Sequence, residues 1–214
     1  MAYRFSIATL LLAGATCLAA PASAGQAGAP RANPFTAPST LPFQAPRFDL
    51  ITDADYQPAF ETAMQQHLAE VARIADNPAP PTFDNTITAL EKSGRMLERV
   101  SLAFFGVVQA NTNDTLDKVQ AAVAPRLSQH QDAINLDPRL FARVKALWDK
   151  RAALNLTPEQ AQVLKVYYDG FVHAGAQLSA ADQTKLKALN TQLASLETSF
   201  QQKLLAAAKA GALV

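Results

Sequence analysis

Apolar residues recur every three or four positions from about Asp53 onward, and no stretch alternates steadily between apolar and polar residues. The first pattern places apolar side chains on one face of an α-helix, whereas a half-buried strand requires the second. Glycine is scarce, at 8 of 214 residues, while alanine and leucine are frequent, which favours helices. We therefore predict an all-α fold of about six helices, mostly antiparallel neighbours because the links between them are short.

Cap residues and prolines indicate the limits of the first helices. An apolar series at positions 60–74 predicts one helix, with Pro58 tolerated in its first turn. Thr82 offers an N-cap for a second helix, whose single apolar stripe extends to Val108. Gly94 interrupts this stripe, and a neighbouring backbone in close approach would explain a glycine there.

Similar signals locate the remaining helices. Asn113 caps a third helix, in which Pro125 is expected to cause a kink or a split. Asp137 and Thr157, each followed by proline, start two more. Ser179 starts the last and longest helix, whose apolar residues have heptad-like spacing over about two heptads, so we expect ordinary bundle packing rather than a coiled coil.

The first 24 residues have the features of a signal peptide. Arg4 is their only charged residue, an apolar run follows at positions 5–20, and small residues at Ala22 and Ala24 fit a signal-peptidase site. The run is too short and too alanine-rich for a membrane-spanning helix. We expect cleavage before Gly25 and a periplasmic location, with an uncleaved anchor as the alternative.

Cysteine and charge exclude several classes of function. Cys17 is the only cysteine, it lies in the expected signal, and the residues before it fit a lipidation site poorly. The mature chain would therefore have no disulfide and no thiolate chemistry. Removing Arg4 from the 19 basic residues leaves 18, against 18 acidic residues, so no net field would attract nucleic acid or anionic lipid.

Residues 25–52 are predicted to form a proline-rich extended arm. Each proline fixes φ and removes a backbone donor, which prevents a long helix or an inner strand. A disordered linker is the alternative and fits residues 26–31 better. We expect the aromatic part to lie on the helical domain through four apolar residues, namely Phe35, Leu41, Phe43 and Phe48.

No known catalytic motif occurs in the sequence. His67, His130 and His173 are far apart, and none has the i, i+4 spacing with which two imidazoles on one helix bind zinc. Each is expected to be a surface or boundary residue. Tyr167 or Tyr168 could hydrogen-bond a ligand, although one of two adjacent helical tyrosines usually packs in the core. We therefore assign no catalytic, cofactor-binding or metal-binding residue.

Six segments, in order, resemble the peptidyl-dipeptidases, or dipeptidyl carboxypeptidases, of the thimet oligopeptidase-like zinc metallopeptidase family. The resemblance extends from about Asn33 to the end of the chain, and its strongest part is Pro81–Ile87 followed by Leu90–Gly94. The other matching segments are Leu41–Ile51, Gln109–Leu116, Leu140–Lys145, Tyr167-Tyr168 with Phe171, and Lys185–Phe200.

The resemblance implies a large helical enzyme with a deep channel between two lobes. Zinc would be held there by a His-Glu-x-x-His helix and a downstream Glu, and the helix Glu would activate the metal-bound water. Such enzymes cleave short peptides, and this branch releases dipeptides from a free carboxyl terminus. The zinc helix and the downstream Glu are absent here, so residues 53–214 are expected to be the N-terminal helical domain, truncated before the catalytic zinc domain.

Two functions therefore remain open. In the first, the chain is part of an exported metallopeptidase whose partners are short peptides and the missing C-terminal catalytic region. This chain alone would then neither hydrolyse peptides nor bind zinc tightly, and it would expose apolar residues of its last helix, namely Leu193, Leu196, Phe200 and Leu204. The alternative is a free-standing exported helical module that binds peptides or acts as a scaffold without catalysis.

Overall fold

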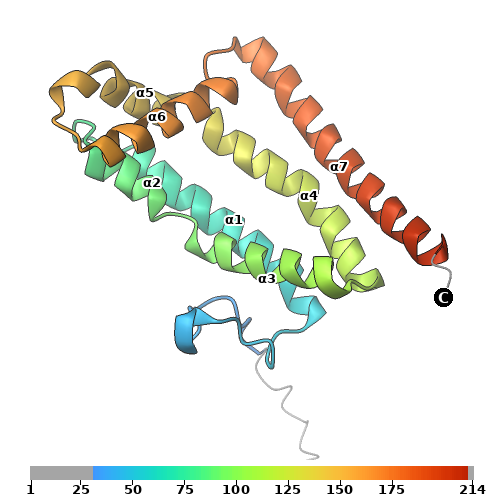
Figure 1. Cartoon of the computed structure of the whole chain (residues 1–214). Coiled ribbons are helices and arrows are strands. Elements are labelled where there is room, and N and C mark those ends of the chain that lie inside the picture. The colour runs from blue at the N-terminus through green and yellow to red at the C-terminus, as the bar shows by residue number, and fades with distance from the viewer. Residues whose placement is uncertain (1–30, 212–214) are drawn as a thin grey trace, which may run out of the picture. The chain divides into compact units, whose positions relative to one another are not determined.

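The computed structural model describes residues 31–211, and this part of the chain forms helices, turns and loops without a strand. The expected signal peptide and residues 25–30 of the expected arm lie outside the described residues. The predicted all-α fold is confirmed (Figure 1). The elements are α1 (Asp53–Ala75), a π-helical turn (Phe83–Thr88), α2 (Ala89–Glu91), α3 (Arg95–Asn111), α4 (Asp114–Asn135), α5 (Pro138–Asp149), a 3₁₀ turn (Arg151–Ala153), α6 (Pro158–His173) and α7 (Ala180–Gly211).

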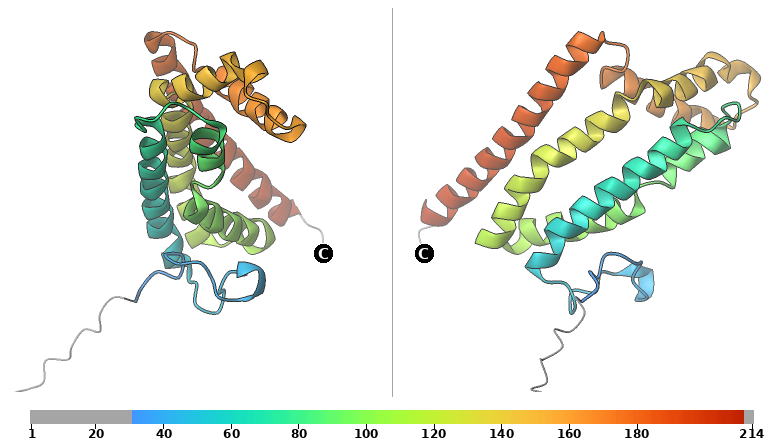
Figure 2. Two further views of the ribbon diagram at one scale, coloured as in Figure 1. Left: turned by 90° about the vertical axis from the view of Figure 1, so that its left-hand side faces the viewer. Right: turned by 180° about the vertical axis from the view of Figure 1, so that it is seen from behind.

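Four of the longer helices pack in the order α3, α1, α4, α7. The helix α1 contacts both α3 and α4, and α7 packs along α4, as the views from front and back agree (Figures 1 and 2). The helices α5 and α6 pack on one another, and α5 also contacts α1. No helix among residues 31–211 combines the length and apolarity needed to cross a membrane.

The helices enclose two hydrophobic clusters. The first, which we call the arm-side cluster, includes Phe60, Phe104 and Val123, all fully buried, with the two phenyl rings edge-to-face at 5.3 Å between centroids. The second, the α6-side cluster, is built around Ile87, Leu140 and Leu164, which are also fully buried. Both α1 and α4 contribute to each cluster, so these two helices join the apolar cores.

The predicted cap residues form the expected hydrogen bonds. Thr82 Oγ1 accepts from the Asn85 amide at 3.1 Å, and Asp137 Oδ1 accepts from the amides of Arg139 at 2.8 Å and Leu140 at 3.3 Å. Equivalent bonds are made by Asn113, Thr157 and Ser179. These oxygens satisfy amides that lack a partner in the first turn of a helix.

Three local expectations were wrong in whole or in part. The second predicted helix is broken, because the chain leaves α2 after Glu91 and turns through Gly94 into α3. Of the two outcomes expected at Pro125, a kink or a split, the split is not found, since α4 continues through it. Pro58 lies beyond the first turn, because α1 already begins at Asp53. The sequence signal missed there was Thr52, whose amide and hydroxyl both donate to Asp55 Oδ2, at 2.7 and 2.8 Å.

The described part of the arm is folded into turns and contains one 3₁₀ turn, Pro42–Gln44. Of the four apolar residues expected to hold it, only Phe35 is buried, in contact with the Tyr56 ring. Leu41, Phe43 and Phe48 are exposed, which corrects the expectation that they pack on the helices. The arm is instead fixed by Asn33, whose side-chain amide donates to the backbone carbonyl of Asp55 at 2.8 Å.

Candidate functional site

Two of the three histidines meet, although 63 residues separate them in the sequence. His67 Nδ1 on α1 lies 3.0 Å from His130 Nε2 on α4, and His67 Nε2 lies 3.2 Å from Ser93 Oγ. The expectation of a surface or boundary position is wrong for His130, which is buried, whereas His67 is half-buried and His173 is exposed at the end of α6. No local spacing rule could have found the pair, because its members belong to different helices.

The hydrogen bonds of this trio determine which nitrogen atoms carry protons. Ser93 Oγ donates to the Leu90 carbonyl at 2.7 Å, so the bond from His67 Nε2 must be donated by the imidazole. Neutral His67 then accepts at Nδ1 from the Nε2–H of His130. His130 Nδ1 remains as an unprotonated acceptor, and it is buried with no hydrogen-bond partner among the described residues.

Burial keeps both rings neutral. Burial, together with a smaller effect of the neighbouring His67 in the same direction, lowers the pKa of His130 to about 4. Burial also lowers the pKa of His67, against a smaller opposing effect of the Glu70 carboxylate.

On α1 the His67 position falls between Met64 of the arm-side cluster and Val71 of the α6-side cluster, so the pair forms a polar contact between the two apolar cores.

Gly94 fits against this pair in a conformation that favours glycine. Its φ is 71°, in the left-handed region, and a β-carbon there would lie 2.8 Å from His67 Cε1. The Gly94 amide donates to Glu70 Oε2 at 2.8 Å. The close neighbour that explains this glycine is thus an imidazole ring and not the expected backbone, and α1 fixes the break between α2 and α3.

The Ser93–His67–His130 arrangement resembles the hydrogen-bonded order of a nucleophile, a base and an orienting group. Two contacts argue against nucleophilic catalysis. The Ser93 proton is directed to the Leu90 carbonyl, and the amides of Ser93 and Gly94 already donate to Leu90 and Glu70. Neither of these two amides is free to stabilise an oxyanion. The trio is a packing device that holds the α2–α3 break.

The described residues do not fit a catalytic zinc. Residues 31–211 contain no group of three or more His, Cys, Asp or Glu side chains placed to hold a metal ion. A catalytic zinc requires about three protein ligands with an open fourth position. Any zinc chemistry would need residues outside this part of the chain.

Beside the histidine pair lies a pocket of about 420 Å³, which we call the α1–α6 pocket. It is bounded by His67 from α1, Glu91 from α2, Ile134 from α4, and Tyr167 and Phe171 from α6. Burial raises the pKa of Tyr167. The hydrogen bond to Glu91 and the negative charge of that residue raise it further, so the Tyr167 hydroxyl remains protonated and donates to the carboxylate. The pocket therefore combines apolar residues, the polar side chains of Ser93, Gln131 and Asn135, and the carboxylate of Glu91, an exposed residue.

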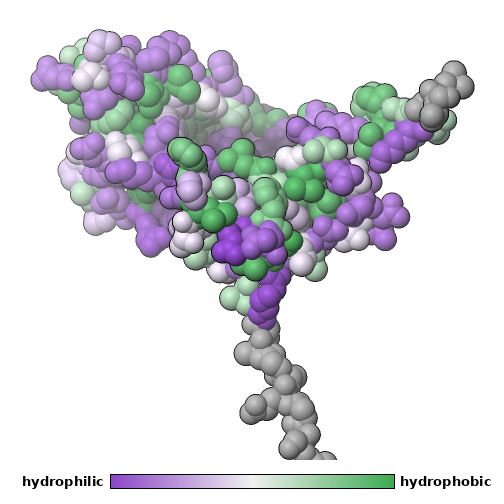
Figure 3. Space-filling model, turned by 60° about the horizontal axis from the view of Figure 1, so that its bottom comes forward, coloured by the Kyte–Doolittle hydropathy of each residue, from purple (hydrophilic) through white to green (hydrophobic). Residues whose placement is uncertain are grey.

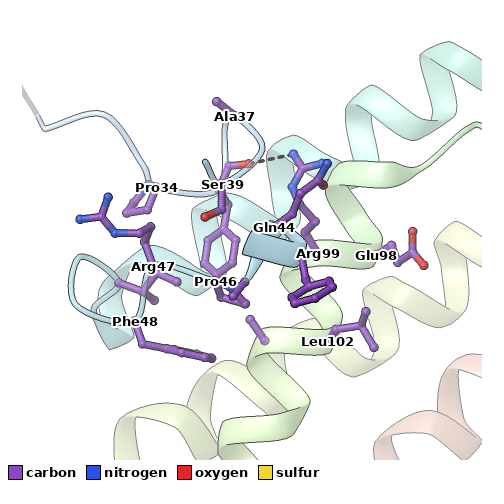
Figure 4. A pocket seen from close by; sticks show the side chains of 15 residues that line it. Pro34, Ala37, Ser39, Gln44, Pro46, Arg47, Phe48, Glu98, Arg99 and Leu102 are labelled. Atoms are coloured by element: carbon purple, nitrogen blue, oxygen red, sulfur yellow. Dashed lines mark hydrogen bonds between the residues drawn. The ribbon is translucent and has the colours of Figure 1, made fainter. Parts of the chain in front are cut away.

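A second pocket, of about 520 Å³, lies between the arm and α3 (Figure 4). Arg99 Nη2 donates to the Phe35 carbonyl at 3.3 Å across it, and Arg47 forms an ion pair with Asp49. Apolar surface gathers on this face of the molecule (Figure 3). Both of its arginines have a partner within the protein, although the Nε of Arg99 is buried without a hydrogen bond to any described residue.

The outer face of α7 is apolar and uncovered. Leu193, Leu196, Phe200 and Leu204 are between 54% and 68% exposed. The opposite face meets α4 through polar side chains, and its only buried residue in the described part is Thr198. The exposure expected for these four residues is confirmed, whereas the expected bundle packing of the apolar stripe is not found.

The chain is similar to known proteins over most of its length. No protein-family model matches it. The dipeptidyl carboxypeptidase of Escherichia coli (strain K12) is 48% identical over 182 residues, which are 85% of this chain and 27% of that protein. The dipeptidyl carboxypeptidase of Salmonella typhimurium (strain LT2) is 45% identical over 181 residues, with the same two shares. The chain thus spans about a quarter of the length of these relatives, in agreement with the resemblance seen in its six segments.

Proposed function

We propose that this chain, a homologue of about a quarter of a dipeptidyl carboxypeptidase, is the helical N-terminal region of an exported zinc metallopeptidase that releases dipeptides from the C-termini of short peptides. The observation that supports this proposal most strongly is the 45–48% identity over 85% of the chain. The all-α architecture is consistent with it. In this proposal zinc is held by a further catalytic region, because residues 31–211 present no ligand group for it.

The α7 surface is the proposed contact with that catalytic region. An uncovered stripe of leucine and phenylalanine along a helix is costly in water and is typical of a protein interface. Its four residues lie on the face of α7 that does not contact α4, so a partner could cover them without disturbing the bundle. We propose that this stripe packs on the catalytic region and that the bundle forms one wall of the peptide channel.

Activity of a longer protein tests the proposal. The reading frame should continue into a His-Glu-x-x-His segment, and the extended protein should release dipeptides from a peptide with a free carboxyl terminus when zinc is supplied. The present chain, assayed beside it, should release none and retain no zinc after dialysis. A genuine stop codon after Val214, with a soluble product that binds peptides, would instead support the free-standing binding module.

Export is tested separately. The Ala22-Ser-Ala24 site predicts that the protein recovered from the periplasm begins at Gly25. N-terminal sequencing of that material decides the point. A protein that retains Arg4, or one confined to the cytoplasm, would contradict the proposed location.

A further inference from the structure

The α1–α6 pocket has one formal charge on its walls. Glu91 carries it, since the only other ionisable side chains there are His67, which burial keeps neutral, and Tyr167, which remains protonated. Glu91 forms no ion pair with any residue in the described part of the chain. The pocket therefore presents a carboxylate without a cationic partner.

Glu91 is an exposed residue, and the one restraint on its carboxylate among residues 31–211 is the hydroxyl of Tyr167. The Tyr167 hydroxyl donates to Glu91 from α6, while Glu91 itself ends α2. The helix α2 is held in turn through Ser93 and Gly94, which are bound to His67 and Glu70 of α1. A side chain restrained in this way loses less conformational freedom when it binds a ligand.

Part of the remaining wall suits a hydrocarbon chain, beside the polar side chains of Ser93, Gln131 and Asn135. Leu90, Ile134 and Phe171 are buried residues of the α6-side cluster, and all three border the pocket. Lysine and arginine side chains have an apolar stem and a charged head, and they bury the stem while the head meets a polar group. A volume of about 420 Å³ lies within the range of small-ligand pockets and can hold such a side chain.

We propose that the α1–α6 pocket binds a lysine or arginine side chain of a peptide, with Glu91 as the counter-ion and Leu90, Ile134 and Phe171 around the aliphatic stem. The inference rests on the proposed function, to which it adds a preference for basic residues in the peptide. Tyr167 acts as a positioning residue for the Glu91 carboxylate. Aspartate and glutamate side chains are disfavoured, because they would place a second negative charge beside Glu91.

The test uses the full chain and three blocked tripeptides, acetyl-Ala-X-Ala-amide, in which X is lysine, norleucine or glutamate. Norleucine matches most of the lysine stem but lacks the charge. We expect amide NMR signals around Glu91, Ser93 and Tyr167 to shift with the lysine peptide. We expect binding to be about threefold to tenfold weaker with norleucine, and weaker still with glutamate. Added salt should weaken binding of the lysine peptide and have little effect on that of the norleucine peptide.

Three variants locate the effect. Glu91→Gln should remove the difference between the lysine and norleucine peptides. Glu197→Gln, an exposed carboxylate on α7 away from the pocket, should leave it unchanged. Tyr167→Phe should reduce the difference between the lysine and norleucine peptides in part. The folding transition of this variant should be unchanged, which would exclude a general loss of structure.

The outcomes separate this inference from the proposed function. Equal binding of the lysine and norleucine peptides would overturn the cation pocket and leave the peptidase proposal intact. Signal shifts confined to another surface would also overturn it. Selective binding of the lysine peptide that depends on Glu91 would support the pocket even if the longer protein proved to have no peptidase activity.

Discussion

Gly94 and His67 are packed so closely that a β-carbon on the glycine would lie 2.8 Å from Cε1 of the imidazole. The ring cannot easily move away, because its two nitrogens are engaged by His130 and Ser93. This contact joins the break between α2 and α3 to the central helix α1.

Gly94→Ala should lower the free energy of unfolding by about 1–3 kcal/mol, because alanine is strained at positive φ and its methyl group would displace the His67 ring. Urea denaturation of both proteins measures the change. Gly106→Ala is the matched control, since nothing lies within 4 Å of its β-carbon position and a helical alanine is favoured there. Equal effects of the two substitutions would show that the Gly94 contact is not important.

The caps at Thr82 and Asp137 should each contribute measurably to stability. Replacing either residue by alanine leaves helix amides without an acceptor and should cost about 0.5–2 kcal/mol. Asp137 should be the more sensitive position, because it also forms an ion pair with Arg139. Thr62→Ala, at an exposed position within α1, serves as the control in urea denaturation. Unchanged stability of both cap variants would contradict the assigned helix starts.

Protonation of the histidine pair should destabilise the fold in acid. The pKa of His130 is about 4 in the folded protein against 6.5 ordinarily, so the unfolded chain binds more protons between these values. The contribution of neutral His130 to stability is thus fully present above pH 6.5 and is lost as the pH falls toward 4. We expect protonation of His130 to lower the free energy of unfolding by about 1–3 kcal/mol as the pH falls through this range.

His130→Gln should flatten this pH dependence, whereas His173→Gln should not, because His173 is exposed. Urea denaturation at pH 7 and pH 4.5 gives the comparison. A wild-type protein as stable at pH 4.5 as at pH 7 would show that the buried pair does not resist protonation.

The apolar stripe of α7 should make the isolated chain self-associate. Replacing Leu193, Leu196 and Phe200 together by glutamine should shift the protein toward the monomer in analytical ultracentrifugation. Its urea midpoint should change little, because the three side chains are exposed and make few contacts within the bundle. A wild-type chain that is monomeric at high concentration would contradict this prediction.

Short-range signals in the sequence predicted the helices well. The oxygens of Thr82, Asp137 and Thr157 act on amides within three residues, so their effect is visible in a short window. The contacts of the candidate site are of another kind. His67 meets His130 across 63 residues, and the register between α1 and α4 that joins them depends on the packing of both apolar clusters. The sequence also indicated an apolar face on α7 but not which face would meet α4.

The contacts between α7 and α4 are mainly polar, and this determines which helix separates from the rest of the protein first. Asn190 donates to Asp132 at 2.8 Å and Gln202 to the Asp117 carbonyl at 2.9 Å, with only Thr198 buried between them. Such contacts bury little apolar area, whereas α1 is anchored by Phe60 at the centre of a core. We therefore expect α7 to form a separate, weakly held cooperative unit that undocks without global unfolding, and its amides to exchange with deuterium well before those of α1.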